Sequence, residues 1–150
     1  MKLRPPNKLY SWIFFGILAV SFYFVNVEVQ SHLGREAIEN TGLNSLSFAE
    51  ATVRSLGEGK LILAEVSAVW CSSCRHLDNQ VFANPEVKRT IDKRFIFSRI
   101  EYESEEGERF IEKYNVTGFP TLFLIRSDGT VARRLQVTFS PEEFLAQLDR

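Results

Sequence analysis

The amino-acid sequence predicts an α/β layer sandwich that follows one N-terminal transmembrane helix. Three observations lead to this prediction. The first thirty residues hold an uncharged apolar run of membrane-spanning length. The remainder alternates short apolar runs of strand length with segments that begin at helix-capping residues. Near the end, two strand-like runs flank a hairpin turn, so the last two strands are expected to be antiparallel neighbours.

The composition fits one globular domain with an accessory segment. Of the 150 residues, 45% are hydrophobic and 25% are charged, and 13 Phe residues supply a large apolar surface for a core. The formal net charge of −1 gives no basic field of the kind that binds nucleic acid. The only cysteines are two residues three positions apart, so thiol chemistry is confined to one pair rather than spread over a framework of structural disulfides.

Residues 9–27 are predicted to form a transmembrane anchor. The run carries no charge, and as a helix with a rise of about 1.5 Å per residue it covers roughly 28 Å, close to one bilayer core. Tyr10, Trp12 and Tyr23 lie near its ends, where amphipathic rings favour the membrane interface.

The flanking charges predict the orientation of this anchor. Lys2, Arg4 and Lys8 precede it, whereas Glu28 is the first charge after it. By the positive-inside rule, residues 1–8 remain in the cytoplasm and the chain from Glu28 onward lies on the far side of the membrane, in the periplasm of a bacterium. We therefore expect a single-pass protein of the inner, or cytoplasmic, membrane.

Two other interpretations of the apolar run stay open. A cleaved signal peptide has a shorter apolar core and a small-x-small cleavage site, whereas residues 22–29 are mostly bulky. A buried core helix of this length usually carries a polar stripe, and this run has none. The anchor is the favoured interpretation.

After the anchor, residues 28–46 are expected to form a juxtamembrane helix extension or linker, and residues 47–150 the folded domain. Ser47 begins a capping box, which predicts a first helix. The apolar stripe expected on this helix consists of Phe48, Ala51, Val53 and Leu56, before Gly57 and Gly59 end it. Residues 60–67 are almost continuously apolar, which is typical of a central parallel strand covered on both faces.

Helix and strand signals alternate through the rest of the domain. Asn84 and Ser140 are suitable N-caps, and each is followed by a proline at the first helical position. A turn at residues 127–129 predicts a closing hairpin. The expected elements are a helix from Pro85, a strand at 95–100, a helix at 105–114 with Phe110 and Ile111 facing inward, strands at 121–125 and 130–137, and a helix from Pro141.

Cys71 and Cys74 are the candidate catalytic residues, in the run Trp70-Cys71-Ser72-Ser73-Cys74-Arg75. A strand ends just before this run and a helix is expected to follow, so Cys71 lies at a helix N-terminus, where unpaired N–H groups and the helix dipole favour its thiolate. Only a thiolate attacks a disulfide, which makes Cys71 the expected nucleophile. Cys74, one turn further on and more buried, is expected to resolve the mixed disulfide.

Other uses of the pair fit the sequence less well. A structural zinc site needs about four ligands, and only His32 and His76 are present besides the pair. Haem attachment needs a histidine directly after the second cysteine, where this chain has Arg75. Two packed thiols without redox function remain an alternative, although Trp70 and the small serines argue against it. We expect no metal and no cofactor beyond a redox-active Cys71–Cys74 disulfide.

Three stretches resemble the thioredoxin superfamily, above all the C-terminal periplasmic domain of the membrane disulfide reductase DsbD. They are residues 65–75, with the cysteine pair, residues 81–87 and residues 114–121. The resemblance spans about Phe48 to Leu148. It implies a thioredoxin-like three-layer α/β/α sandwich with a mixed sheet and the activity of a protein-disulfide oxidoreductase.

The resemblance also implies roles for residues around the pair. Glu65 stands where thioredoxins carry a buried acid, usually Asp, and where protein disulfide isomerases carry Glu. Such a carboxyl is expected to take and return the proton of Cys74. Pro120 matches the cis-proline that faces the cysteines, so the backbone of Phe119 is expected to pair with an extended substrate. Trp70 is expected to shape the same substrate-binding surface.

The leading functional hypothesis is therefore a reductase or electron relay. It would take electrons from an integral membrane donor of the DsbD or CcdA type and pass them to oxidised proteins outside the cytoplasm, for example in cytochrome c maturation. An oxidase or isomerase, and a redox-inactive assembly module, stay open. The residues between the cysteines do not fix the direction, because reduction potentials in this superfamily differ by over about 100 mV.

Overall fold

Strand β1 (Leu61–Ser67) is an inner strand of a four-stranded sheet, and six of its seven residues are buried. The structure is a computed structural model that describes residues 8–149. Strand β2 (Phe95–Glu101) lies parallel to β1 on one side, and β3 (Thr121–Ile125) lies antiparallel to it on the other. Strand β4 (Val131–Leu135) completes the order β2-β1-β3-β4, antiparallel to β3. The predicted mixed sheet and closing hairpin are confirmed.

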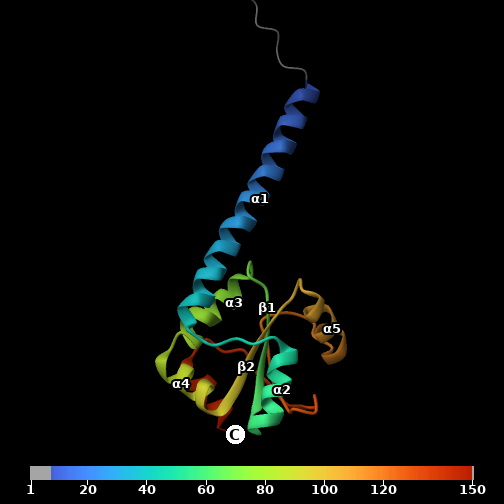
Figure 1. Ribbon diagram of the computed structural model, residues 1–150. Helices are drawn as coiled ribbons and strands as arrows, with labels where there is room; N and C mark the ends of the chain where they lie inside the picture. Colours follow the sequence, from blue (N-terminus) through green and yellow to red (C-terminus); the bar gives the residue numbers. More distant parts are fainter. Residues whose placement is uncertain (1–7, 150) are drawn as a thin grey trace, which may run out of the picture.

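Helices cover both faces of this sheet (Figure 1). One core joins the sheet to α2 (Phe48–Glu58) and α5 (Glu105–Tyr114), and its helical members include Ala51 and Phe110. The opposite core joins the sheet to four further elements. These are α3 (Ser72–Leu77), the single π-helical turn η1 (Asp78–Phe82), α4 (Pro85–Arg94) and α6 (Pro141–Leu148). Two cores on either side of one sheet make the three-layer sandwich that the sequence predicts.

The predicted capping residues begin their helices. Ser47 and Glu50 form the reciprocal capping box of α2, Asn84 accepts hydrogen bonds from the first N–H groups of α4, and Ser140 caps α6. The expected apolar stripe of α2 is wrong in two positions, because Val53 and Leu56 are 74% and 75% exposed. At about 100° per residue they point away from the face that Ala51 and Ser55 bury.

Helix α1 (Lys8–Thr41) runs without interruption from the apolar segment into the folded domain (Figure 1). Its apolar part is exposed, and by length and composition it can cross a membrane. Its last turns pack against α3 and η1. The segment after the apolar run, expected to be a helix extension or linker, is therefore helical to Thr41. Residues 1–7, whose charges support the predicted orientation, lie outside the described residues.

Candidate active site

The two cysteines lie where β1 ends and α3 begins, and they form a disulfide with a Cα–Cα separation of 5.3 Å. Cys71 is the N-cap of α3, and its Sγ accepts a hydrogen bond from the backbone N–H of Cys74 at 3.1 Å. Cys71 is 8% exposed and Cys74 only 1%. Cys74 is therefore the more buried of the two cysteines, as the sequence predicts.

Aromatic side chains surround the exposed side of the disulfide. Trp70 and Phe119 pack against the small cluster that contains both cysteines, and their ring centroids are 5.4 Å apart. Tyr102, from the loop after β2, lies 4.9 Å from the ring of Phe119. The peptide bond from Phe119 to Pro120 is cis, as the resemblance implies. The structure thus brings Trp70 and Phe119 together beside the pair, with Pro120 directly after Phe119.

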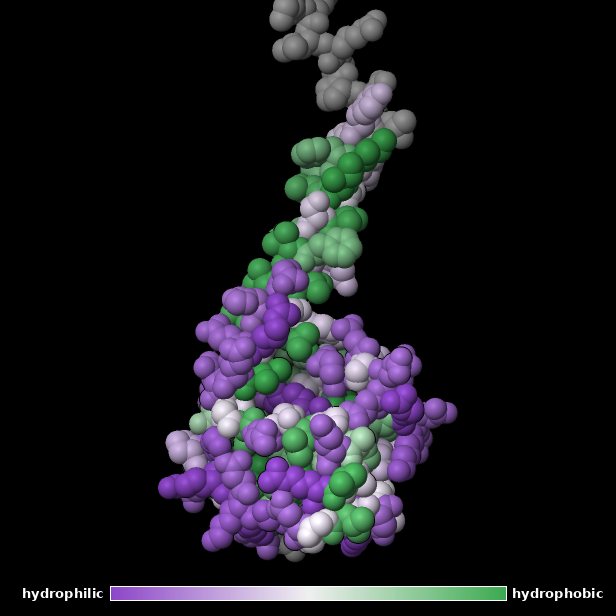
Figure 2. Space-filling view, viewed as in Figure 1, coloured by the Kyte–Doolittle hydropathy of each residue, from purple (hydrophilic) through white to green (hydrophobic). Residues whose placement is uncertain are grey.

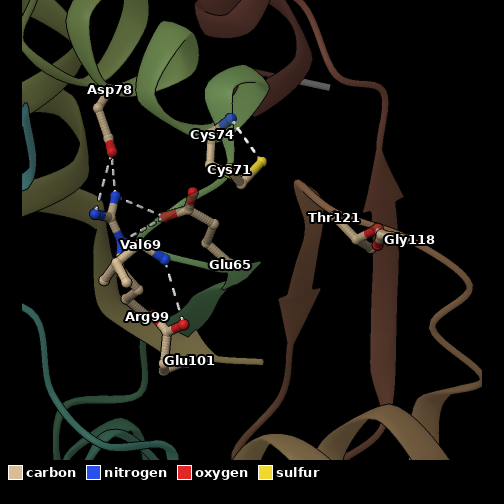
Figure 3. Close-up of a disulfide and its surroundings, with 9 residues drawn as sticks. All are labelled: Glu65, Val69, Cys71, Cys74, Asp78, Arg99, Glu101, Gly118 and Thr121. Carbon is tan, nitrogen blue, oxygen red and sulfur yellow. Dashed lines mark hydrogen bonds and ion pairs between the residues drawn. A yellow bond between two sulfur atoms is a disulfide. The ribbon is translucent and has the colours of Figure 1, made fainter. Parts of the chain in front are cut away.

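Glu65 is completely buried beneath the pair on β1 (Figure 3). Arg99 occupies the matching position of the parallel strand β2 and donates from Nε to Glu65 Oε2 at 2.8 Å. The guanidinium also donates through both Nη atoms to the carboxylate of Asp78 on η1. Among residues 8–149, Glu65 Oε1 has no hydrogen-bond partner, and Figure 3 shows it directed towards Cys74.

These three side chains form a buried ion cluster, which we call the Glu65–Arg99–Asp78 cluster. Burial raises the pKa of Glu65 to about 7, since Asp78 adds to the effect and the nearby Arg99 charge only partly opposes it. Burial also raises the pKa of Asp78. Two carboxyl groups share one cation, so a proton on Glu65 makes the cluster neutral. A protonation change near pH 7, next to the buried sulfur, suits a group that accepts and returns a proton.

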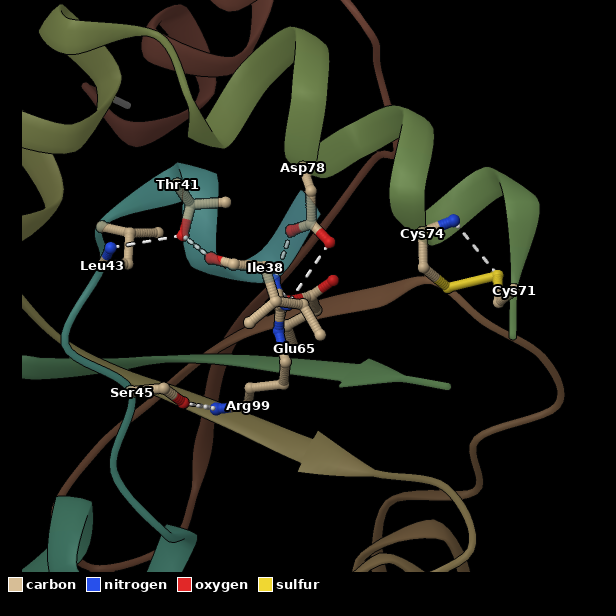
Figure 4. A network of polar contacts seen from close by, with 9 residues as sticks. All are labelled: Ile38, Thr41, Leu43, Ser45, Glu65, Cys71, Cys74, Asp78 and Arg99. Atoms are coloured by element: carbon tan, nitrogen blue, oxygen red, sulfur yellow. Dashed lines mark hydrogen bonds and ion pairs between the residues drawn. A yellow bond between two sulfur atoms is a disulfide. The ribbon is translucent and has the colours of Figure 1, made fainter. Parts of the chain in front are cut away.

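The end of α1 lies on the same side of the sheet as this cluster (Figure 4). Ile38 is drawn beside Arg99 and Asp78, and Thr41 Oγ1 donates to the carbonyl oxygen of Ile38 at 2.7 Å. The chain then turns so that Ser45 Oγ accepts from the backbone N–H of Arg99 at 3.0 Å. The end of α1 therefore packs on the helical segment η1, which carries Asp78.

A comparison with models of protein families identifies the family to which this chain belongs. Residues 48–150 match the family model described as a thioredoxin-like domain. The chain belongs to the thioredoxin-like family. It is a thioredoxin-like protein with a Cys-x-x-Cys disulfide, in agreement with the resemblance drawn from the three sequence stretches.

Individual thioredoxin-like relatives include thiol:disulfide interchange proteins. DsbD of Pseudomonas fluorescens is 28% identical over 54% of this chain and 14% of its own length. DsbD of Haemophilus ducreyi is 20% identical over 99% of this chain and 27% of its own length. The chain thus spans about a quarter or less of these curated relatives. The oxidised C-terminal domain of Neisseria meningitidis DsbD is 23% identical, with a TM-score of 0.58 over 71% of this chain and 97% of that domain, and supports the fold.

Sequence reasoning missed Arg99, Asp78 and Tyr102 in this thioredoxin-like site. Arg99 is the one charge inside the otherwise apolar or small run 95–100, which is the same kind of signal that singled out Glu65. Asp78 follows Cys74 by four residues, the spacing that places two side chains on one helix face. No local pattern distinguishes Tyr102 from an ordinary loop residue.

Proposed function

We propose that this chain is a membrane-tethered thiol–disulfide oxidoreductase that reduces disulfides of proteins outside the cytoplasm through Cys71 and Cys74. The observation that carries the proposal is the asymmetry of the pair. One sulfur caps a helix and belongs to the less buried cysteine, whereas the other is almost completely buried above a carboxyl group whose pKa burial raises to about 7. A pair of thiols that served only to fill the core would need neither feature.

The proposed reaction has two exchanges. The Cys71 thiolate attacks a substrate disulfide, forms a mixed disulfide and expels one substrate sulfur as a thiolate. The Cys74 thiolate then attacks Cys71 Sγ and releases the second substrate sulfur. Two electrons have moved to the substrate, and the pair is left as the disulfide. A dithiol donor reverses both exchanges and restores the reduced pair.

Specific groups of the chain assist each exchange. The N–H of Cys74 points at Cys71 Sγ and favours negative charge there, as does the N-terminus of α3. We assign to Glu65 the transfer of the Cys74 proton, since its unpaired oxygen faces that residue. Trp70, Phe119 and Pro120 form the surface on which we expect a substrate segment to lie.

The membrane tether belongs to the same proposal. The packing of Ser31, Gly34, Ala37 and Thr41 into the domain supports retention of α1 from about Gln30 onward. With the apolar run ahead of it retained as well, the domain is held at the outer face of the inner membrane. We propose that an integral membrane protein of the DsbD or CcdA type supplies the electrons there.

The direction of electron flow is tested by the reduction potential. The full chain in detergent is equilibrated with glutathione buffers, and the fraction of Cys71–Cys74 disulfide is measured by thiol alkylation. A reductase is expected at or below the potential of thioredoxin, about −270 mV, whereas a value near about −120 mV would identify an oxidase. The Cys71→Ser variant, assayed for insulin reduction, separates both from a redox-inactive module, because only the module is unaffected.

A further inference from the structure

The membrane-proximal helix is in direct backbone contact with the active-site loop. Gly34 of α1 lies against Val69, so closely that a Cβ at position 34 would overlap the Val69 carbonyl oxygen. Val69 is two residues before Cys71. This part of α1 therefore cannot move towards the domain without displacing the loop that carries the catalytic pair.

Further contacts fix the helix to the active-site elements. Arg75, the residue after Cys74, donates from Nη1 to Gln30 Oε1 at 2.6 Å. Ser31, Ala37 and Thr41 are buried on the same side of α1 as Gly34. A helix held at several successive turns cannot swivel like a flexible linker, and α1 continues unbroken back to Lys8.

The length of helix between the apolar run and these contacts sets the distance of the active site from the membrane surface. From Val27 to Gly34 there are seven residues, which correspond to about 10 Å of helix. Figure 1 shows that α1 leaves the domain at the end where β1 meets α3. Figure 2 shows apolar residues along the part of the helix that projects from the domain. The active-site end of the domain therefore faces the membrane.

A groove of about 430 Å³ opens between α1 and the active-site loop. One wall is formed by residues at the outer end of the apolar run, Tyr23, Asn26 and Val27 among them, and the other includes Val69 and Trp70. Because one wall belongs to the segment at the lipid boundary, an occupant of the groove must itself lie at that boundary. The lining is both apolar and polar, which suits a chain that emerges from a bilayer.

We propose that α1 is a rigid strut that holds Cys71 at the membrane surface, and that the partner of the pair is a cysteine of an integral membrane protein exposed about two helical turns above the bilayer. This inference rests on the proposed function and narrows its partner class. The occupant of the groove is the membrane-proximal segment that carries this cysteine, rather than a freely diffusing protein.

The experiment uses the full chain, reduced and freed of excess reductant, in phosphatidylcholine vesicles. The probes are single-pass Leu-rich helical peptides with one cysteine as its 2-pyridyl disulfide, placed about seven or about fourteen residues beyond the apolar segment, or about 10 and 21 Å. Cys71 expels pyridine-2-thione and binds the peptide sulfur, and Cys74 then releases the peptide thiol. The protein dithiol is oxidised as the probe is reduced by two electrons, and the thione is read by absorbance.

The matched variant carries seven extra helix-forming residues between Val27 and Glu28, which raise the domain by about 10 Å and turn it by only about 20°. The control carries the same seven residues after Arg150. We expect the unaltered chain and the control to react at least about tenfold faster with the nearer cysteine, and the α1 insertion to reverse this preference, which no loss of folding would do.

Equal rates on both membrane peptides in every variant would overturn the strut. The same pyridyl disulfide on a water-soluble peptide reports on the chemistry alone and is expected to react equally with all three proteins. If the unaltered chain released no thione even from this soluble probe, the proposed oxidoreductase function would be wrong. That result differs from the loss of the preference for the membrane peptide with the nearer cysteine.

Discussion

Replacing Glu65 with Gln removes a titratable group from beneath the disulfide while nearly conserving side-chain size. The Gln carbonyl can still accept from Arg99, and Asp78 still pairs with that guanidinium, so the packing of the cluster is expected to persist. What the variant loses is the ability to hold a proton. The substitution therefore separates proton transfer from structure.

The expected change in the free energy of unfolding follows from the pKa of Glu65, which burial raises from 4.5 to about 7. A shift of this size corresponds to about 3 kcal/mol of preference for the neutral acid. The folded chain keeps the proton between these two values whereas the unfolded chain releases it, so the free energy of unfolding falls as the pH rises from about 4.5 to about 7. With Gln this part of the slope disappears, and the variant is the more stable protein above pH 7.

The expected decrease in the rate of resolution follows from the loss of the proton acceptor. In the proposed mechanism, ionised Glu65 removes the Cys74 proton at neutral pH. Without it, resolution of the mixed disulfide is expected to slow by about a hundredfold or more and to depend on hydroxide instead. The first attack by Cys71 is expected to change far less, since that sulfur is the less buried of the two and lies at the N-terminus of α3.

Both effects are measurable on the full chain in detergent. Acid quenching and mass spectrometry follow the lifetime of a mixed disulfide on Cys71 between about pH 5 and pH 8, and chemical denaturation over the same range gives the slope of stability. Glu101→Gln is the matched control, because burial also raises the pKa of Glu101 but its carboxylate accepts from the N–H of Val69. A resolution rate within about twofold of the unaltered chain at every pH would refute the role assigned to Glu65.

Three further tests, each by substitution, address separate parts of the structure. Cys74→Ser should accumulate mixed disulfides with substrates on non-reducing gels and Cys71→Ser should not; equal trapping would contradict the assignment of the nucleophile. Arg99→Met should lower the free energy of unfolding by about 3–5 kcal/mol at pH 8, because two buried carboxyl groups lose their cation. At pH 5 the decrease should be smaller. A decrease that is the same at both pH values would argue against this cause. Gly34→Ala should lower the thermal midpoint of unfolding, because the added methyl group overlaps the active-site loop. Gly57→Ala should raise the thermal midpoint, because the space around Gly57 is open and alanine adds up to about 1 kcal/mol of helix propensity. Equal effects of the two variants would show that α1 is not tightly packed at Gly34.

The fold was largely predictable because its signals are local. Strand β3 and helix α5 have the bounds that the sequence predicts, since a buried strand is a short apolar run and a capped helix begins at a recognisable residue. The exposed Val53 and Leu56 show the limit of this reasoning. The expected stripe includes apolar residues of α2 that lie at different angles around the helix axis, and this angle decides which side chains reach the core.

The docking of α1 on the domain was not predictable in the same way. The apolar run is evident from composition, but the next turns contact the active-site elements through small residues such as Ser31, Gly34 and Ala37. Small residues on a helix are compatible with exposure, with a linker or with close packing. Only the three-dimensional position of Val69 shows that Gly34 is needed to let two backbones meet.

The partner of Glu65, by contrast, follows from two single charges that the sequence contains once the bounds and register of the two strands are known. Glu65 is the fifth residue of β1 and Arg99 is the fifth residue of β2, and the two strands pair in parallel from Leu61 opposite Phe95. Equal offset in parallel strands places the two charges side by side, and a charge buried in one strand requires compensation from a neighbour. Asp78 then adds a second carboxyl to the single cation, and this surplus of negative charge helps burial to raise the pKa of Glu65 into the range where a thiol can give up its proton. The register of the two strands thus pairs the single charges of two apolar runs and creates the environment that the proposed proton transfer by Glu65 requires.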